Sequence, residues 1–221
     1  MALRILPFRQ YSDHDVVNLY SHLEADVNDN TISSGRGDAG LFVKVHAGNF
    51  DLDPITYQDR AYLGKRDYPF LGTAEMYPEV NLKITGAEAG DLPLGLTLFQ
   101  TAKNDENGQK LLYNPEKQLE AQAMLPGQAV PVATKGIFTL AAAAFDGPIT
   151  DYAPGNRIKI SDATPGKVTG FAVSALTAGS GALFEEQKSF GHVLGTGHRG
   201  SVGITTDQFS GNYIVVSIDC N

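Results

Sequence analysis

Residues 146–170 read DGPITDYAPGNRIKISDATPGKVTG, and this stretch indicates the fold class. Short apolar runs are separated by turn residues, with Pro-Gly pairs at 154–155 and 165–166. A Pro-Gly pair suits the two central positions of a type II turn. The pattern therefore predicts short strands joined by tight turns, which is typical of a mainly β protein.

The same punctuation continues from Ala129 to the end of the chain. The strands that it predicts are 130–133, 136–143, 157–161, 167–175, 190–194 and 213–219. Roughly six short strands within about ninety residues favour a small closed β-barrel, because closing a sheet removes its exposed edges. We therefore assign residues 129–221 to a C-terminal small β-barrel domain.

Residues 41–128 are predicted to form a β-rich middle domain. Strands are expected at 41–46, 80–85 and 95–101. The segment 115–124 is open to two interpretations. Asn114-Pro115-Glu116 is typical of a helix start, but the alternation that follows, from Leu119 to Leu125, also suits a strand.

Residues 1–40 differ from the rest and are interpreted as an N-terminal extended arm with a flexible linker. Residues 3–11 are apolar and basic, and Ser12 could cap two helical turns over 16–23. The Asn-, Asp-, Ser- and Gly-rich segment 28–40 is typical of a flexible connector. Because the apolar groups of such an arm need a surface to bury them, we expect a partner surface.

Composition excludes several classes of protein. The 221 residues include 17 Lys and Arg against 25 Asp and Glu, a net charge of -8, which repels polyphosphate and argues against nucleic-acid binding. A single cysteine, Cys220, excludes a disulfide scaffold and a cysteine zinc cage. The longest apolar run, near 137–145, is far below the roughly 18 residues of a membrane span. Pro7 interrupts the N-terminal apolar run, so we expect no secretion signal, synthesis in a cytoplasm and no membrane partner.

Several motifs match a chemical pattern only in part. The run 195–200 fits G-x-G-x-x-G, but too little chain follows for a βαβ unit, so we interpret it as a glycine-rich turn. The P-loop-like 165–167 has Val168 where Ser or Thr is required. His192 and His198 lack the spacing of a zinc pair. We therefore expect no cofactor, no metal site and no enzymatic activity; a small hydrolase or nucleotide-binding enzyme is the least favoured alternative.

Four stretches resemble structural proteins of tailed bacteriophages, particularly those that infect cyanobacteria. They are LRILPFRQYSDHDVVNLY (3–20), GQAVPVATKGIFTL (127–140), SDATPGKVTG (161–170) and the block from HVLGTG (192–197) to Asp219. The family that their order implies is the capsid decoration, or cement, proteins. Such proteins lie on the outer surface of the phage head and brace adjacent major capsid proteins, often through an extended N-terminal arm and a small SH3-like barrel.

The resemblance implies that the chain is a non-enzymatic virion protein, made in the host cytoplasm. Its partners would be the major capsid protein and further copies of itself, as a trimer or, as an alternative, a dimer. The candidate capsid-binding residues of the arm are Leu3, Arg4, Ile5, Leu6, Phe8, Arg9 and Tyr11. The apolar ones would serve as anchors and the two arginines would bind carboxylates. The alternative is a head-fibre base or a tail-associated adhesion protein, which an aromatic-rich loop cluster would favour, and Tyr57, Tyr62 and Tyr68 are the candidates for such a cluster.

Overall fold

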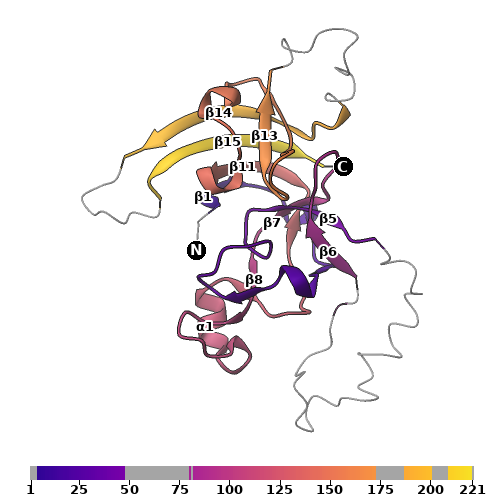
Figure 1. Cartoon of the computed structure of the whole chain (residues 1–221), viewed down its shortest axis with the longest axis vertical. Coiled ribbons are helices and arrows are strands. Elements are labelled where there is room, and N and C mark those ends of the chain that lie inside the picture. The colour runs from indigo at the N-terminus through magenta and orange to yellow at the C-terminus, as the bar shows by residue number, and fades with distance from the viewer. Residues whose placement is uncertain (1–3, 48–79, 81, 173–186, 201–208, 221) are drawn as a thin grey trace.

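Three β-sheets organise the part of the chain that the computed structural model describes, which comprises residues 4–47, 80, 82–172, 187–200 and 209–220 (Figure 1). The first sheet contains the long strands, in the order β1 (Ile5–Gln10), β11 (Lys135–Ala141), β15 (Gly211–Asp219), β14 (Gly191–Arg199), β12 (Arg157–Ile160) and β13 (Val168–Phe171). All of its pairings are antiparallel. The prediction of a mainly β protein is confirmed.

The other two sheets are built from shorter strands. The second sheet has the order β2 (Val16–Val17), β10 (Val132–Ala133), β7 (Gly95–Thr97), β5 (Phe42–Val45), β6 (Lys83–Gly86) and β3 (Ser21–His22). The third consists of β4 (Asn28–Asn30), β8 (Gln100–Asn104) and β9 (Ala123–Met124). The described helical elements are α1 (Pro115–Glu120) and the 3₁₀ turns η1 (Asp13–Asp15), η2 (Glu24–Asp26), η5 (Leu111–Tyr113), η6 (Ala142–Ala144) and η7 (Ile149–Tyr152).

The main core lies between the inner face of the first sheet and the second sheet. Alternate residues of β11 and β15, among them Phe138, Leu140 and Ile214, are fully buried there. Phe42 and Leu96 of the second sheet belong to the same cluster. Apolar burial of this kind is the dominant stabilising contribution to folding. The two sheets therefore fold around one shared core.

The N-terminal residues form part of this body instead of the predicted extended arm. β1 pairs with β11, and β2 and β3 join the second sheet. Residues 16–23 form these short strands because Val16 and Val17 complete the sheet edge next to β10 instead of continuing a helix after η1. Sheet pairing thus satisfies backbone groups that a detached arm would leave to solvent.

The predicted linker 28–40 is also ordered. Asn28–Asn30 pair in parallel with β8, and Asp38 is buried. The first sheet draws strands from residues 1–40 and 129–221, and the second draws on all three predicted segments. The predicted segment boundaries therefore mark changes in composition, and strands from different segments pair within one sheet.

The predicted closed barrel is not found in the described part of the chain, where the first sheet has separate edges at β1 and β13. The glycine-rich turn expected at 195–200 is wrong as well, because β14 runs through Gly195 and Gly197 to Arg199. For residues 115–124 the two interpretations each hold in part: helix α1 is followed by strand β9. No helix among the described residues combines the length and the hydropathy that a membrane crossing requires.

Candidate functional site

The outer face of the first sheet carries a second set of apolar residues. In β11 and β15, Phe138 and Val216 point into the core, whereas the neighbouring Thr139 and Val215 point outward and lie opposite each other in the ladder. Runs that are apolar in both alternating positions are typical of strands covered on both faces. Within the described chain, Val215 is only half-buried, so this face is incompletely covered.

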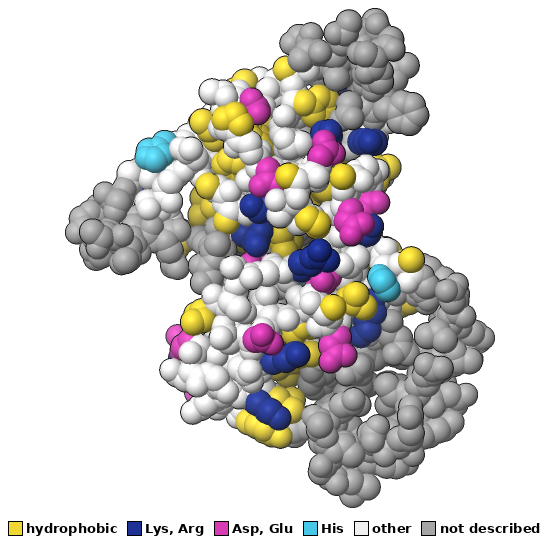
Figure 2. All heavy atoms as spheres, in the orientation of Figure 1, with side chains coloured by type: hydrophobic (Ala, Val, Ile, Leu, Met, Phe, Trp, Pro, Cys, Tyr) yellow, Lys and Arg dark blue, Asp and Glu magenta, His cyan; other side chains and the backbone are white. Residues whose placement is uncertain are grey.

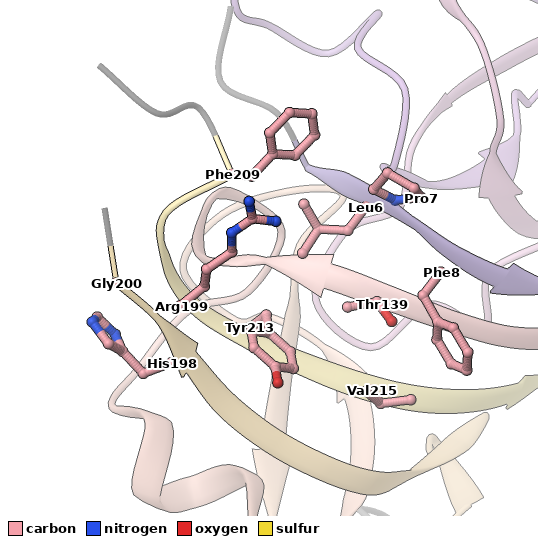
Figure 3. A pocket seen from close by; sticks show the side chains of 10 residues that line it. All are labelled: Leu6, Pro7, Phe8, Thr139, His198, Arg199, Gly200, Phe209, Tyr213 and Val215. Atoms are coloured by element: carbon pink, nitrogen blue, oxygen red, sulfur yellow. The ribbon is translucent and has the colours of Figure 1, made fainter. Parts of the chain in front are cut away.

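A groove of about 1080 Å³ lies over this outer face (Figure 3). Its apolar lining comes from β1, β11, β15 and Phe209, two residues before β15. The residues are Leu6, Pro7, Phe8, Thr139, Phe209, Tyr213 and Val215, with His198, Arg199 and Gly200 at the β14 end. In Figure 3, Leu6, Arg199 and Phe209 gather at one end, and Phe8 lies towards the other. The groove is open and mostly apolar, which suits a protein or ligand surface of the same character.

A bulge in β1 forms one wall of the groove. Ile5 lies opposite Leu140 and Arg9 lies opposite Phe138, so β1 advances further than β11 between these two pairs. The extra chain carries Pro7 and Phe8 away from the sheet, and the Phe8 side chain is 68% exposed. A bulge of this kind redirects side chains at the edge of a sheet.

The described residues among the predicted apolar capsid anchors are divided between the groove and the core. Leu6 and Phe8 line the groove. Ile5 is buried in the core, and Tyr11 stacks on Phe138 with the ring centroids 5.7 Å apart. Leu3 lies outside the described residues.

The two predicted carboxylate-binding arginines have different surroundings. Arg4 Nε donates to Asp38 Oδ2 at 3.0 Å, and Arg4 Nη1 donates to the Ala143 carbonyl at 3.0 Å. Asp38 Oδ1 also accepts from the Asn28 side chain at 2.9 Å. This buried network fixes the start of β1 to the body. Arg9 is half-buried and borders a smaller hollow of about 260 Å³ on the other side of β1.

His198 and Arg199 lie at one end of the groove. The Arg199 guanidinium lies 5.7 Å from the centre of the Phe209 ring, a cation–π distance. His198 Nδ1 lies 2.9 Å from Asn212 Oδ1. On the face seen in Figure 2, basic and acidic side chains alternate without a large patch of one sign. In a chain of net charge -8, the Arg199 guanidinium beside an apolar groove favours a partner with a carboxylate.

Sequence reasoning missed the groove residues Arg199, Phe209, Tyr213 and Val215. The available signal was the run from Tyr213 to Val216, which is apolar at every position and therefore has more apolar residues than one covered face needs. Phe209 and Arg199 gave no such signal, since only the fold brings them beside β1.

Other polar clusters serve the structure. Ser161 Oγ donates to Asp146 Oδ2 at 2.7 Å, and the Lys167 ammonium lies 3.1 Å from Asp146 Oδ1. Burial raises the pKa of Asp146, but hydrogen bonds from Ser161, Lys167 and Thr164 outweigh it and leave that pKa lowered. Because Ser161 Oγ also accepts two backbone N–H groups, this cluster closes the turn between β12 and β13 and has no free nucleophile.

The remaining sequence motifs do not form sites in the described residues. The run Arg36-Gly37-Asp38 spells an integrin-type tripeptide, but its Asp38 is 1% exposed and bound within the fold. Burial raises the pKa of the Cys220 thiol to about 12, so this cysteine is protonated and unreactive at neutral pH. No cluster of three or more potential metal ligands occurs in the described chain.

Comparisons with known proteins give no identification: no protein-family model, no curated protein and no solved structure matches the chain.

Proposed function

We propose that the chain is a capsid decoration protein that binds the outer surface of a phage head through the groove on its first sheet. The observation that carries the proposal is the open apolar lining of the groove at Leu6, Phe8 and Val215, of which Phe8 is 68% exposed, beside the cationic Arg199. Exposed apolar patches that are rimmed by polar groups are typical of protein-binding surfaces. The resemblance of four stretches to phage structural proteins supplies the identity of the partner.

The proposed partner segment is apolar and carries a carboxylate. Its apolar side chains would contact Phe8 and Val215, and its carboxylate would bind near Arg199. Burying an aromatic anchor contributes most to such an interface, whereas a charge at the rim affects the rate of association and its salt dependence. A shell offers the same contact many times, so a modest affinity per site still gives stable decoration.

This view revises the expected mechanism of the N-terminal segment. A detached arm would contribute all of its apolar residues to the capsid, but Ile5 and Tyr11 already pack in the core. Only the bulged part of β1 remains for a partner. Removing residues 1–27 would delete β1, β2 and β3 and so test folding together with binding. A single substitution in the groove tests binding to the capsid without removing a strand of the fold.

The test compares Phe8→Ala with Tyr113→Ala, an aromatic residue of similar exposure outside the groove (68% and 64% exposed). Each variant is mixed with purified heads that lack the protein, and bound copies are counted after sedimentation. We expect Phe8→Ala to weaken binding at least tenfold and Tyr113→Ala to bind like the wild type. Equal binding by wild type and Phe8→Ala, with both variants folded, would overturn the groove as the capsid site.

A second measurement distinguishes decoration of the head from the alternative of a head-fibre base or tail adhesin. Cryo-electron microscopy of the virion should locate the chain over the lattice of major capsid proteins. Density confined to the tail would favour adhesion. The three tyrosines that motivated the adhesion hypothesis, Tyr57, Tyr62 and Tyr68, lie outside the described residues.

A further inference from the structure

Among the described strands, the part of β14 beyond Val193 has a neighbour on one side only. β14 pairs with β15 from Gly191 to Arg199, but with β12 only at Gly191 and His192. Val193 then bonds the backbone of the loop before β12, donating to the Asn156 carbonyl at 2.8 Å and accepting from the Gly155 N–H at 2.9 Å. No described strand pairs with the outer side of residues 194–199.

The alternation of the ladder identifies which groups this edge presents. Because Val193 bonds away from β15, its partner Val216 also bonds away from β14. Along the regular strand β15, Val215 and Tyr213 must then bond towards β14, to Gly195 and Gly197. The backbone N–H and C=O groups of Thr196 and His198 consequently point outward.

The other two edges of the first sheet are protected against strand addition, whereas no described residue pairs with the outer side of β14 beyond Val193. β1 has Pro7 and a bulge, two features that block pairing. β13 is covered at Val168, which accepts hydrogen bonds from the Asp146 backbone and the Tyr152 hydroxyl. β14 instead has small residues at Gly195 and Gly197, and a Cβ added at Gly195 would meet nothing within 4 Å.

We propose that the β14 edge pairs with the β14 edge of a second copy of this chain, antiparallel and across a two-fold axis at Gly197. In this register Thr196 of one copy lies opposite His198 of the other. These two residues form a hydrogen-bonded pair, and the two-fold axis generates the same pair a second time. Glycine lies opposite glycine at the axis, and Arg199 lies opposite Gly195. No like charges are opposed, and the strand is complementary to itself.

The purpose of the dimer rests on the proposed function, but the test of dimer formation does not. A two-fold axis perpendicular to the sheet leaves both grooves on the same face of the dimer. Both grooves can then contact one capsid surface, which multiplies the two affinities through avidity. Edge pairing is isologous, so it gives the dimer and not the trimer of the two expected assemblies.

Thr196→Pro tests the pairing in the isolated full-length chain. Proline removes the outward N–H of residue 196 and leaves the bonds to β15, since an edge position with its N–H towards solvent tolerates proline. Thr196→Val is the matched control, because it keeps the N–H and the β-branched shape. The self-association constant is measured by sedimentation velocity from micromolar to millimolar protein.

We expect wild type and Thr196→Val to form dimers and Thr196→Pro to associate at least tenfold more weakly at an unchanged melting temperature. Hydrogen exchange at the Thr196 and His198 amides should slow with protein concentration in the wild type. A wild type that stays monomeric up to millimolar concentration would overturn the proposal, as would concentration-independent exchange at both amides. Neither outcome affects the capsid proposal, because each groove lies within one chain and its test counts copies on heads.

Discussion

Phe138 and Phe8 lie on neighbouring strands of one sheet, and their surroundings differ completely. Phe138 is 0% exposed and packs in the core, whereas Phe8 is 68% exposed at the groove. Both faces of the sheet carry apolar residues, but the described chain covers the inner one more completely: on the outer face Thr139 is buried, Val215 is half-buried and Phe8 is exposed. An apolar residue on the inner face therefore contributes to stability, and one on the outer face is available to a partner.

The largest expected effect comes from the inner face. Phe138→Ala should lower the free energy of unfolding by about 3–5 kcal/mol, since it removes buried contacts and leaves a cavity. Urea denaturation followed by circular dichroism measures this loss. Phe8→Ala is the matched control and should leave the unfolding midpoint nearly unchanged. Comparable losses in the two variants would mean that the two faces are equally covered.

The contact that keeps β1 on the sheet is tested next. Asp38→Ala should cost about 3 kcal/mol, because it leaves the Arg4 guanidinium buried without its carboxylate. Hydrogen exchange at the amides of β1 should rise more than exchange at β15. Arg36→Ala serves as the control, since the Arg36 side chain is 54% exposed and 3.8 Å from its partner Asp26. If exchange rose equally in both strands, Asp38 would stabilise the whole fold and not β1 in particular.

The next prediction concerns His22, a buried histidine in the second sheet. His22 lies in β3, where neither ring nitrogen has a hydrogen-bond partner among the described residues, and burial lowers its pKa from 6.5 to about 4 despite the nearby Asp26 carboxylate. The unfolded chain therefore binds a proton at a higher pH than the folded chain. The His22 contribution is present in full above pH 6.5 and is lost as the pH falls towards 4, by about 3 kcal/mol in all.

The comparison of wild type with His22→Leu isolates this contribution, because both chains share the same carboxylates. Unfolding free energies measured from pH 7 to pH 4 should fall more steeply in the wild type. Parallel curves for the two proteins would show that His22 is hydrated in solution.

The smallest effects concern two glycines on the outer face. Gly195→Ala should stabilise the strand by about 0.5 kcal/mol, since nothing occupies the space of the new methyl group. Gly197→Ala should cost about 1 kcal/mol, because the methyl group would meet the Tyr213 ring and displace it. Thermal unfolding measures the stability of the two variants, and protein fluorescence reports displacement of the Tyr213 ring. A stabilised Gly197→Ala variant would indicate that Tyr213 does not lie over this glycine in solution.

Local signals predicted individual strands well. Strands 157–161 and 213–219 were located to within two residues, since the Pro-Gly turns and the apolar runs depend on neighbouring residues alone. The glycines of β14 were misinterpreted as a turn, because no local rule shows that Tyr213 of the neighbouring strand covers Gly197.

The candidate site was predicted in part. The apolar and basic character of residues 3–11 identified a segment that needs burial, and Leu6 and Phe8 do line the groove. The sequence offered no means of dividing these residues between core and surface. That division depends on the bulge of β1 against β11 and on the Arg4–Asp38 ion pair, and the ion pair joins residues 34 positions apart.

By itself, the sequence determined that this protein is mainly β, that its turns fall at Pro-Gly pairs, and that its first residues need an apolar surface. These properties follow from backbone sterics, alternation and hydrophobicity, which act over a few residues. The tertiary structure alone decided which surface that is, because β1 finds β11 more than a hundred residues away in the sequence. Pairing at that separation depends on the whole core, which decides which apolar residues the described chain buries and which it leaves exposed, as at Phe8.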